Sequence, residues 1–340
     1  MQQNVQKDRP IVGFTIGDIN GIGPEVLIKS LADSRILKIC IPVIYASNKL
    51  LNRYKKIMNI GDELQFFVTK SIEEINFKRI NLINCWEDDF EPEPGKETAI
   101  GGKAALLSLE KATTDLQANK IDALVTAPVS KNNMQQDNFK FPGHTEYLAS
   151  KLNAEVLMTM VSEELEFRLA VCTGHIPLES VKNSLTTEKI SKCLNIFHQS
   201  LKNDFKIEKP KIAILGLNPH AGENGLLGKE EEQTISPLIK KFKDQGMLVF
   251  GPYPADGFFG NQLYKKFDGI LAMYHDQGLI PFKTLAFDSG INFTAGLPVI
   301  RTSPDHGTAF DIAGKNIADE SSFRQALYLA AKLAKARMKN

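Results

Sequence analysis

The chain has 340 residues, of which 43% are hydrophobic and 24% charged, and its 41 basic and 40 acidic side chains leave a formal net charge of +1. This is the composition of a soluble globular protein long enough for two lobes of ordinary domain size. The balanced charge argues against a nucleic-acid partner, because phosphate neutralisation needs clustered Lys and Arg. Every apolar run is shorter than the roughly 20 residues of a membrane helix, so no membrane partner is expected.

The four cysteines are Cys40, Cys85, Cys172 and Cys193, and no two of them have the spacing of a metal motif. Cys40 and Cys172 fall in apolar runs and are expected to be small buried side chains. The first ten residues, MQQNVQKDRP, are polar and lack the apolar stretch of a signal peptide. These features predict a reduced, cytoplasmic protein.

Short apolar runs alternate with amphipathic segments along the whole chain. The runs predicted to be buried strands span residues 11–16, 40–46, 64–69, 123–129, 211–217 and 269–274. The segments with helical spacing of apolar residues span 102–119, 186–205 and 321–336. Thr186 or Thr187 is expected to cap the second of these helices. The alternation predicts an α/β fold with mostly parallel sheets.

The stretch TIGDINGIGPEV (residues 15–26) places three glycines between the first predicted strand and a helix-like segment. Gly17, Gly21 and Gly23 have the spacing G-x-x-x-G-x-G, so the stretch matches neither the dinucleotide fingerprint nor the P-loop. Pro24 suits the first position of a helix, and Glu25 favours the helix dipole. The stretch is therefore interpreted as a tight strand-to-helix turn.

The segment FPGHTEYLASKL (residues 141–152) is predicted to begin a helix at Pro142, where free N–H groups favour an anion. His144 and Thr145 would add side-chain donors there. Further donors end apolar stretches later in the chain, at Lys283, Asn292 and Arg301. Together they would suit a phosphorylated substrate. Taken singly, Thr145 could be only a helix cap and Lys283 only a surface charge.

Three histidines, His175, His220 and His275, each follow an apolar strand directly. In parallel sheets the carboxyl ends of strands meet at one edge, where ligands bind. Neutral imidazole is the commonest transition-metal ligand, so the three could hold a catalytic metal with positions open for substrate. The alternative is that each is a loop or core histidine with a satisfied hydrogen bond, which is the interpretation adopted for mid-helix His198. Asp276 could orient a ligand, bind metal, act as a base or cap a turn.

The stretch SPDHGTAFDIAGKNIAD (residues 303–319) resembles the adenosine-binding loop of the isocitrate/isopropylmalate dehydrogenase superfamily, whose pattern reads H-G-[ST]-A-x-D-I-A-G-K. The resemblance implies cofactor contacts from His306, Gly307, Thr308, Ala309 and Asp311. Asp311 would bind the ribose hydroxyls of the adenosine. Its carboxylate would repel the extra phosphate of NADP, so NAD is expected and NADP is the alternative.

Several longer motifs resemble the 4-hydroxythreonine-4-phosphate dehydrogenase family, which acts in pyridoxal 5′-phosphate synthesis. They include GDINGIGPEV, VTAPVSK, FPGHTEYLA, GLNPHAGENGLLGKEE, GPYPAD, MYHDQGLIPFK and GLPVIRTSPDHGTA. The family usually reads Gly-Asp-Pro-Ala-Gly-Ile-Gly in the first motif, where this chain has Ile19 and Asn20. The resemblance implies two α/β/α lobes with an active-site cleft between them. Residues 1–130 and 290–340 would form the cofactor lobe, and residues 131–289 a central lobe with the metal ligands and the dimer interface.

The resemblance also implies an activity and a set of ligands. The substrate would be 4-phosphooxy-L-threonine, oxidised by NAD to a β-keto acid that loses CO2. One divalent metal (Zn, Mg or Co) would bind His175, His220 and His275 and be shared between the subunits of a homodimer. The implied substrate contacts are His144, Thr145, Lys283, Asn292 and Arg301. Asp256 and Asp276 are the candidates for the general base.

Three other functions remain as alternatives. The same scaffold could oxidise another phosphorylated hydroxy acid, such as 4-phosphoerythronate or phosphothreonate. A phosphate acyltransferase would share the broad fold, but it would need neither the histidines nor the adenosine loop. A non-catalytic binding protein would explain a cleft but not three histidines placed as metal ligands.

Overall fold

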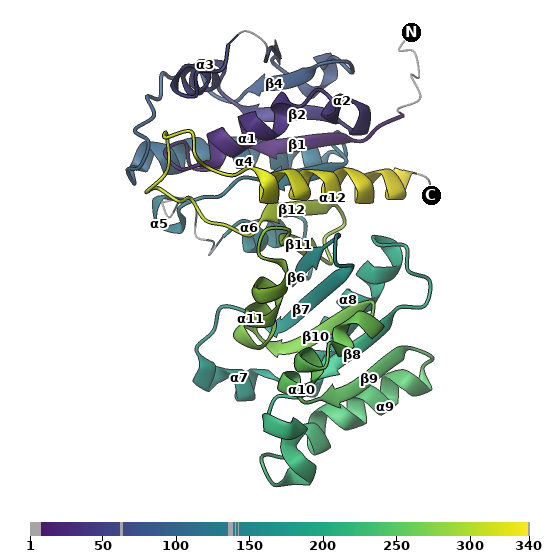
Figure 1. Cartoon of the computed structure of the whole chain (residues 1–340). Coiled ribbons are helices and arrows are strands. Elements are labelled where there is room, and N and C mark those ends of the chain that lie inside the picture. The colour runs from purple at the N-terminus through teal and green to yellow at the C-terminus, as the bar shows by residue number, and fades with distance from the viewer. Residues whose placement is uncertain (1–7, 62–63, 135–138, 140, 142, 339–340) are drawn as a thin grey trace. The chain divides into compact units, whose positions relative to one another are not determined.

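The computed structural model describes residues 8–61, 64–134, 139, 141 and 143–338. Pro142, predicted to begin a helix, lies outside these residues. The chain forms two compact units, unit 1 from residues 1–154 and 297–340 and unit 2 from residues 155–296. These bounds differ from the expected central lobe at 131–289, because the described residues between 131 and 154 fall in unit 1. The first strand and the last helix, purple and yellow in Figure 1, both belong to unit 1.

Unit 1 contains a parallel sheet whose described strands run in the order β3-β4-β2-β1-β5-β12. Their bounds are β1 Ile11–Thr15, β2 Ile41–Ala46, β3 Phe66–Thr69, β4 Ile80–Asn84, β5 Ala123–Thr126 and β12 Ile300–Pro304. Every residue of β1, β2, β5 and β12 is buried. This is why their sequences are continuously apolar rather than alternating.

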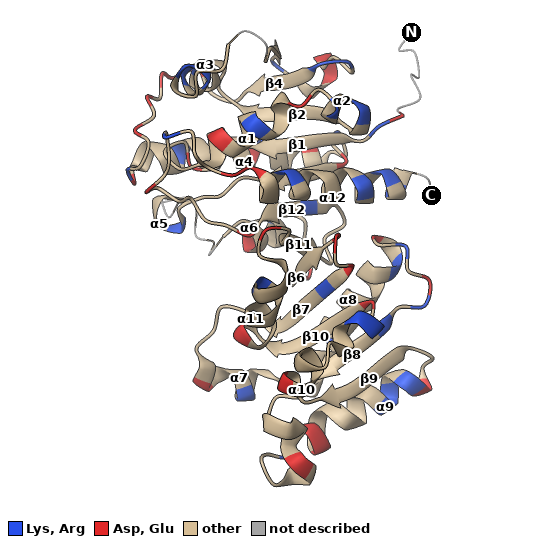
Figure 2. Cartoon of the chain, in the orientation of Figure 1, with Lys and Arg blue, Asp and Glu red and all other residues tan. Residues whose placement is uncertain are grey.

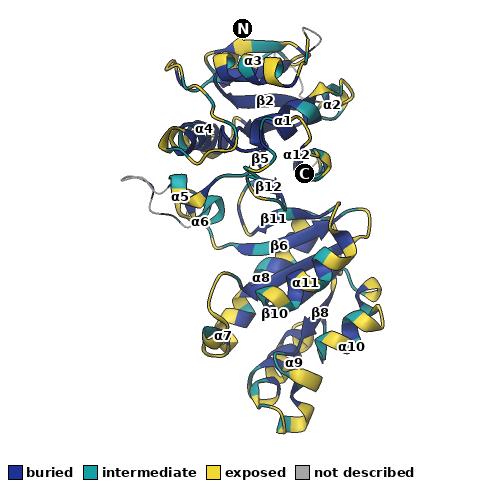
Figure 3. Cartoon of the chain, turned by 60° about the vertical axis from the view of Figure 1, so that its left-hand side comes forward, coloured by how far each residue is buried: buried dark blue, intermediate teal, exposed yellow. Residues whose placement is uncertain are grey.

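Helices cover the sheet of unit 1. Their bounds are α1 Gly23–Ala32, α2 Ile36–Ile39, α3 Asn48–Ile57, η1 Ile72–Glu74, α4 Ala99–Gln117, α5 Lys131–Met134, α6 His144–Lys151 and α12 Ser321–Met338. Helix α4 packs on β1, β2 and β5, and α12 packs on β12, β5 and β1. Figure 3 shows these two helices on the two sides of the buried strands. The predicted stripe on the last helix is confirmed, since Phe323, Ala326, Ala330 and Leu333 are all buried.

Unit 2 contains a mixed sheet with the described strand order β11-β6-β7-β10-β8-β9. Its strands are β6 Leu157–Ser162, β7 Phe167–Thr173, β8 Lys211–Leu215, β9 Leu248–Tyr253, β10 Gly269–Tyr274 and β11 Ile291–Ala295. The pairs β11–β6 and β6–β7 are antiparallel, whereas β7–β10, β10–β8 and β8–β9 are parallel. The carboxyl ends of β7, β10 and β8 therefore lie at the same edge of the sheet.

The helical elements of unit 2 pack around this sheet. They are α7 Leu178–Ser184, α8 Thr187–Asn203, η2 Pro219–Gly225, η3 Glu231–Ile235, α9 Ser236–Asp244, α10 Ala255–Gly260, η4 Leu263–Lys266 and α11 His275–Ala286. Helix α8 buries Ile190, Leu194, Phe197 and Leu201, one face of a regular helix. Its predicted cap is confirmed, because the Thr186 hydroxyl accepts a hydrogen bond from the Lys189 N–H at 3.1 Å.

Other predictions about the chain are also met by the structure. The α/β class with mostly parallel sheets is confirmed, and all six predicted strands are present with ends shifted by a few residues. Cys40 and Cys172 are buried, and all four cysteines are free thiols. Basic and acidic residues are interspersed along the helices of both units, as Figure 2 shows. Within the described residues, each helix is too short or too polar to cross a membrane.

An aromatic cluster in the core of unit 2 provides a test of the packing. Phe282 of α11 is fully buried and stacks on Phe167 of β7, with ring centroids 5.2 Å apart. Phe282→Ala should lower the free energy of unfolding by about 3–5 kcal/mol, because the cavity would not collapse fully. Phe287→Ala is the matched control, since Phe287 directly follows the same helix and is 74% exposed. Urea denaturation followed by circular dichroism measures both, and equal effects would contradict the packing described.

Candidate active site

A buried guanidinium organises the first cluster of predicted site residues in unit 1. Arg301 of β12 is only 3% exposed. It donates to the Thr126 hydroxyl at 2.6 Å and to the Thr145 hydroxyl at 3.5 Å. Burial lowers the pKa of Arg301 to about 10, so the side chain stays cationic at neutral pH. Three segments far apart in the sequence therefore meet around one positive charge.

His144 is the first residue of α6 and belongs to the same cluster. Burial is the main cause that lowers the pKa of His144 to about 3, and the charges of Arg301 and Lys131 lower it further. The ring is therefore neutral at physiological pH. Its Nε2 atom is buried and has no hydrogen-bond partner among the described residues. A neutral imidazole beside a buried cation can donate a hydrogen bond to an anionic ligand.

The predicted cofactor loop, residues 303–319, is held by the glycine-rich stretch at the start of the chain. The Ile22 N–H donates to the carbonyl of Thr308 at 2.9 Å. A Cβ atom at Gly21 would lie 2.8 Å from that carbonyl oxygen, so only glycine allows this approach. The spacing of the three glycines matches no known phosphate-binding motif, but one of them, Gly21, packs against the backbone of Thr308. His306 lies in the same loop, and burial lowers its pKa.

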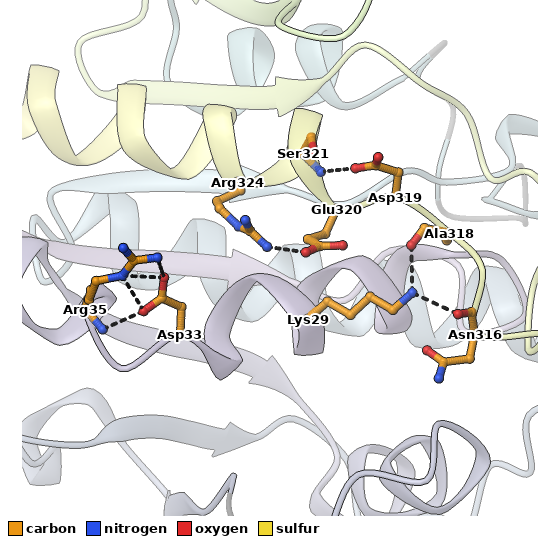
Figure 4. A network of polar contacts seen from close by, with 9 residues as sticks. All are labelled: Lys29, Asp33, Arg35, Asn316, Ala318, Asp319, Glu320, Ser321 and Arg324. Atoms are coloured by element: carbon orange, nitrogen blue, oxygen red, sulfur yellow. Dashed lines mark hydrogen bonds and ion pairs between the residues drawn. The ribbon is translucent and has the colours of Figure 1, made fainter.

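Helix α1 supports the rest of this loop with two charged side chains, one turn apart. The Lys29 ammonium donates to the carbonyls of Asn316 at 3.2 Å and Ala318 at 2.7 Å, as Figure 4 shows. The Glu25 carboxylate accepts a hydrogen bond from the Gly314 N–H at 3.2 Å. Asp311 itself is exposed, so its carboxylate is open to a ligand.

Two of the three predicted metal ligands lie close together in unit 2. The rings of His175 and His275 have centroids 5.5 Å apart, and both line an open pocket of about 470 Å³. The His275 Nδ1 atom lies 2.7 Å from the Asp276 carboxylate. That contact would leave the Nε2 atom of His275 to bind a metal, since a ligating histidine commonly bonds a carboxylate through its other ring nitrogen.

His220 lies on η2, after the adjacent strand β8, and its backbone is left-handed (φ 52°). The parts of the chain that the structure describes contain no group of three or more His, Cys, Asp or Glu side chains that could hold a metal. The three histidines follow strands, as predicted, and those strands are adjacent, but the described residues do not bring three ligands together. Two hydrogen bonds link the ends of these strands. The Gln277 side chain donates to the Gly216 carbonyl at 2.6 Å, and the Thr173 hydroxyl donates to the Met273 carbonyl at 2.9 Å.

The remaining predicted residues lie in unit 2. Lys283 lies in the second half of α11 and Asn292 in β11, and both are half-buried. Asp276 and Lys283 belong to a helix that begins at His275 and that the sequence did not predict. Asp256 lies in the first turn of α10 and is exposed.

Two polar residues of unit 1, Thr126 and Asp18, were not predicted from the sequence. Thr126 binds Arg301, and the buried carboxylate of Asp18 accepts a hydrogen bond from the Asn133 side chain at 2.9 Å. Burial raises the pKa of Asp18. Its place directly after Gly17, at the end of β1, is the signal that could have identified it.

Comparison with known proteins identifies close relatives over nearly the whole chain. The family model described as "Pyridoxal phosphate biosynthetic protein PdxA" matches residues 38–330. A protein of Bacteroides thetaiotaomicron named 4-hydroxythreonine-4-phosphate dehydrogenase is 46% identical over 326 residues, which cover 96% of this chain and 89% of the relative. A D-threonate 4-phosphate dehydrogenase of Cupriavidus necator is 41% identical and covers 96% of this chain and 97% of its own.

Solved structures agree with this assignment. The crystal structure of 4-hydroxythreonine-4-phosphate dehydrogenase from Klebsiella pneumoniae superposes with a TM-score of 0.83 at 34% identity. The match covers 97% of this chain and 99% of that one. The fold is therefore shared over its full length.

The low pKa of His144 makes a prediction about pH. An unfolded histidine has a pKa of about 6.5 and the folded ring one of about 3, so below about pH 6.5 the unfolded chain binds the extra proton first. The contribution of His144 to stability should therefore be complete above pH 6.5 and be lost as the pH falls. NMR of the imidazole should show a neutral ring throughout from about pH 5 to pH 8. A ring that titrates near pH 6.5 would contradict the buried placement.

Proposed function

The chain belongs to the PdxA family of pyridoxal phosphate biosynthetic proteins, and on that premise we propose that it oxidises 4-phosphooxy-L-threonine with NAD. The chain is a dehydrogenase acting on a CH–OH group. The product would be 2-amino-3-oxo-4-phosphooxybutanoate, a β-keto acid that loses CO2 to give 3-amino-2-oxopropyl phosphate. This step would serve pyridoxine 5′-phosphate synthesis. The match to relatives named for this activity over 96% of the chain carries the proposal.

The phosphate group of the substrate would bind the cluster around Arg301. The buried guanidinium supplies a full positive charge and directional donors. The Thr145 hydroxyl and the neutral His144 ring add further donors at the start of α6, where the helix dipole favours an anion. Lys283 and Asn292 of unit 2 remain predicted substrate contacts.

A dehydrogenase of this family uses a nicotinamide cofactor and a divalent metal, and the donor set fits both. His175 and His275 offer two nearby imidazoles, one of them oriented by Asp276. The third proposed ligand is His220, and Zn, Mg or Co would act as a Lewis acid that lowers the pKa of the substrate alcohol. His306, Gly307, Thr308, Ala309 and Asp311 would hold the adenosine of NAD. Asp276 already contacts His275, and Asp256 is the other candidate for the general base.

A homodimer is part of the proposal, because the described residues of one chain do not bring three ligands together. Sharing of each metal between two subunits would complete the set. Three large apolar side chains on unit 2, Leu178, Leu226 and Ile280, are 64–77% exposed and would be covered by such an association.

One alternative substrate has specific support. The relative of Cupriavidus necator, at 41% identity, is named for D-threonate 4-phosphate. A phosphothreonate carries the same phosphate and would meet the same cluster around Arg301. 4-Phosphoerythronate is a further alternative of the same chemical class.

A substrate panel tests the function directly. Formation of the reduced nicotinamide should be fastest with 4-phosphooxy-L-threonine and slower with D-threonate 4-phosphate and 4-phosphoerythronate. It should also be slower with NADP than with NAD. A chelator should abolish the activity, and added Zn, Mg or Co should restore it. A higher kcat/KM for D-threonate 4-phosphate would replace the proposed substrate with the alternative, and activity with all metal removed would exclude the metal assignment.

Gly21 gives a test of the cofactor loop. In Gly21→Ala the new methyl group would displace Thr308. The dissociation constant for NAD should rise about tenfold, equivalent to about 1.4 kcal/mol. Gly61→Ala is the control, because a Cβ atom there has no neighbour within 4 Å among the described residues. Calorimetric titration measures both, and unchanged affinity in Gly21→Ala would separate the first turn from cofactor binding.

A further inference from the structure

The segment that carries His220 has an unusual backbone. Five successive residues from His220 to Asn224 have positive φ angles, between 44° and 81°. Glycine alone adopts such angles without strain, and Gly222 is the only glycine among them. Strained backbone of this kind persists only where neighbouring groups fix it, and it occurs most often at functional sites.

Glu231 is the group that fixes this segment. Its side chain is buried, at 2% exposure. One carboxylate oxygen, Oε1, accepts hydrogen bonds from the N–H groups of Leu217 at 2.7 Å and Asn218 at 2.8 Å. The other, Oε2, accepts one from the Asn218 side-chain amide at 2.9 Å. A Cβ atom at Gly222 would lie 2.6 Å from Oε2, so the carboxylate contacts the chain on both sides of His220.

Glu230 connects the same segment to the helix that follows His175. Its Oε2 atom accepts a second hydrogen bond from the Asn218 amide at 2.8 Å. Its Oε1 atom lies 2.6 Å from the Lys182 ammonium on α7. The hydrogen bonds from Lys182 and Asn218 lower the pKa of Glu230 to about 2, so the bridge is charged at neutral pH.

We propose that Glu231, with Glu230, is a positioning residue that sets the place of the His220 imidazole for a divalent metal. The proposal rests on the assignment of His220 as a metal ligand in the proposed function. Glu231 acts through the backbone on both sides of His220, and Glu230 links that backbone to α7. Metal–ligand distances tolerate only about 0.2 Å of error, so small movements of this segment weaken binding.

The amide of Asn218 makes Glu231→Gln a sharp probe. If the new Gln oxygen keeps the two backbone N–H groups, its NH2 group faces the NH2 group of Asn218. Reversal of the Asn218 amide would remove that conflict, but it would set an oxygen against the Glu230 carboxylate. The substitution therefore costs at least one hydrogen bond at nearly constant volume.

The experiment measures Co²⁺ affinity of the full chain by calorimetry and absorption. Glu231→Gln should raise the dissociation constant about 10–100-fold, as for other residues that orient metal ligands. It should leave NAD affinity unchanged. In the metal-free protein, the amides of Leu217 and Asn218 should exchange hydrogen faster. Glu232→Gln is the matched control, with the same charge change at the next residue, which is exposed, and it should stay within about twofold.

Two further variants separate the possible failures. His220→Ala should weaken Co²⁺ binding, and adding Glu231→Gln to it should cause no further loss. If His220→Ala leaves the affinity unchanged, the metal assignment in the proposed function is wrong. If His220→Ala weakens binding and Glu231→Gln does not, the positioning role is overturned and the proposed function stands. Should Glu231→Gln fail to fold, Glu230→Gln decides: several-fold weaker Co²⁺ binding supports the proposal, and unchanged binding overturns it.

Discussion

The approach of Gly21 to Thr308 is the constraint on which the placement of the predicted cofactor loop in unit 1 depends. It joins the first turn of the chain to the loop before the last helix. Lys29 extends the same contact to the carbonyl of Ala318, 289 residues away in sequence. Closing so long a loop costs little more entropy than closing a shorter one, but the contact must still be specific to hold a surface loop in place. A glycine, a backbone hydrogen bond and a buried carboxylate supply that specificity.

In unit 2 the order of the strands determines where the three histidine segments begin. β7, β10 and β8 are adjacent and parallel, so the three histidine segments start from the same edge of the sheet. Hydrogen bonds such as that from Gln277 to the Gly216 carbonyl hold the strand ends together. The final position of each histidine ring then depends on the segment that carries it. That segment is a left-handed turn at His220 and a regular helix at His275.

Sequence patterns predicted the elements with strong local signals and missed those without them. Local sequence was sufficient to predict the strands β1, β2 and β10 and the cap of α8. Both kinds of feature depend only on residues that are neighbours in the sequence. β4 contains Asn81 and Asn84, and β9 contains Pro252, so polar and ring residues interrupt the pattern that marks a strand. The helix from His275 was not predicted, because Gly278 and Pro281 break its helical pattern.

The predicted site residues also differ in whether a local sequence signal marks them. Local sequence context predicted Arg301 and His144, but Thr126, which accepts a hydrogen bond from Arg301, is a plain strand residue whose role arises only from packing. The left-handed backbone at His220 likewise depends on Glu231, which the motif contains but spacing alone does not connect to it.

Buried polar atoms in unit 1 show what this arrangement costs in stability. His144 Nε2, His306 Nε2 and one oxygen of Glu25 are buried without a hydrogen-bond partner among the described residues. Each such atom opposes folding by about 1–3 kcal/mol, because it loses water and gains nothing in return. All three lie in or beside the segments assigned to substrate and cofactor. A ligand that forms hydrogen bonds with these atoms would bind only the folded chain, and its binding would therefore stabilise that state.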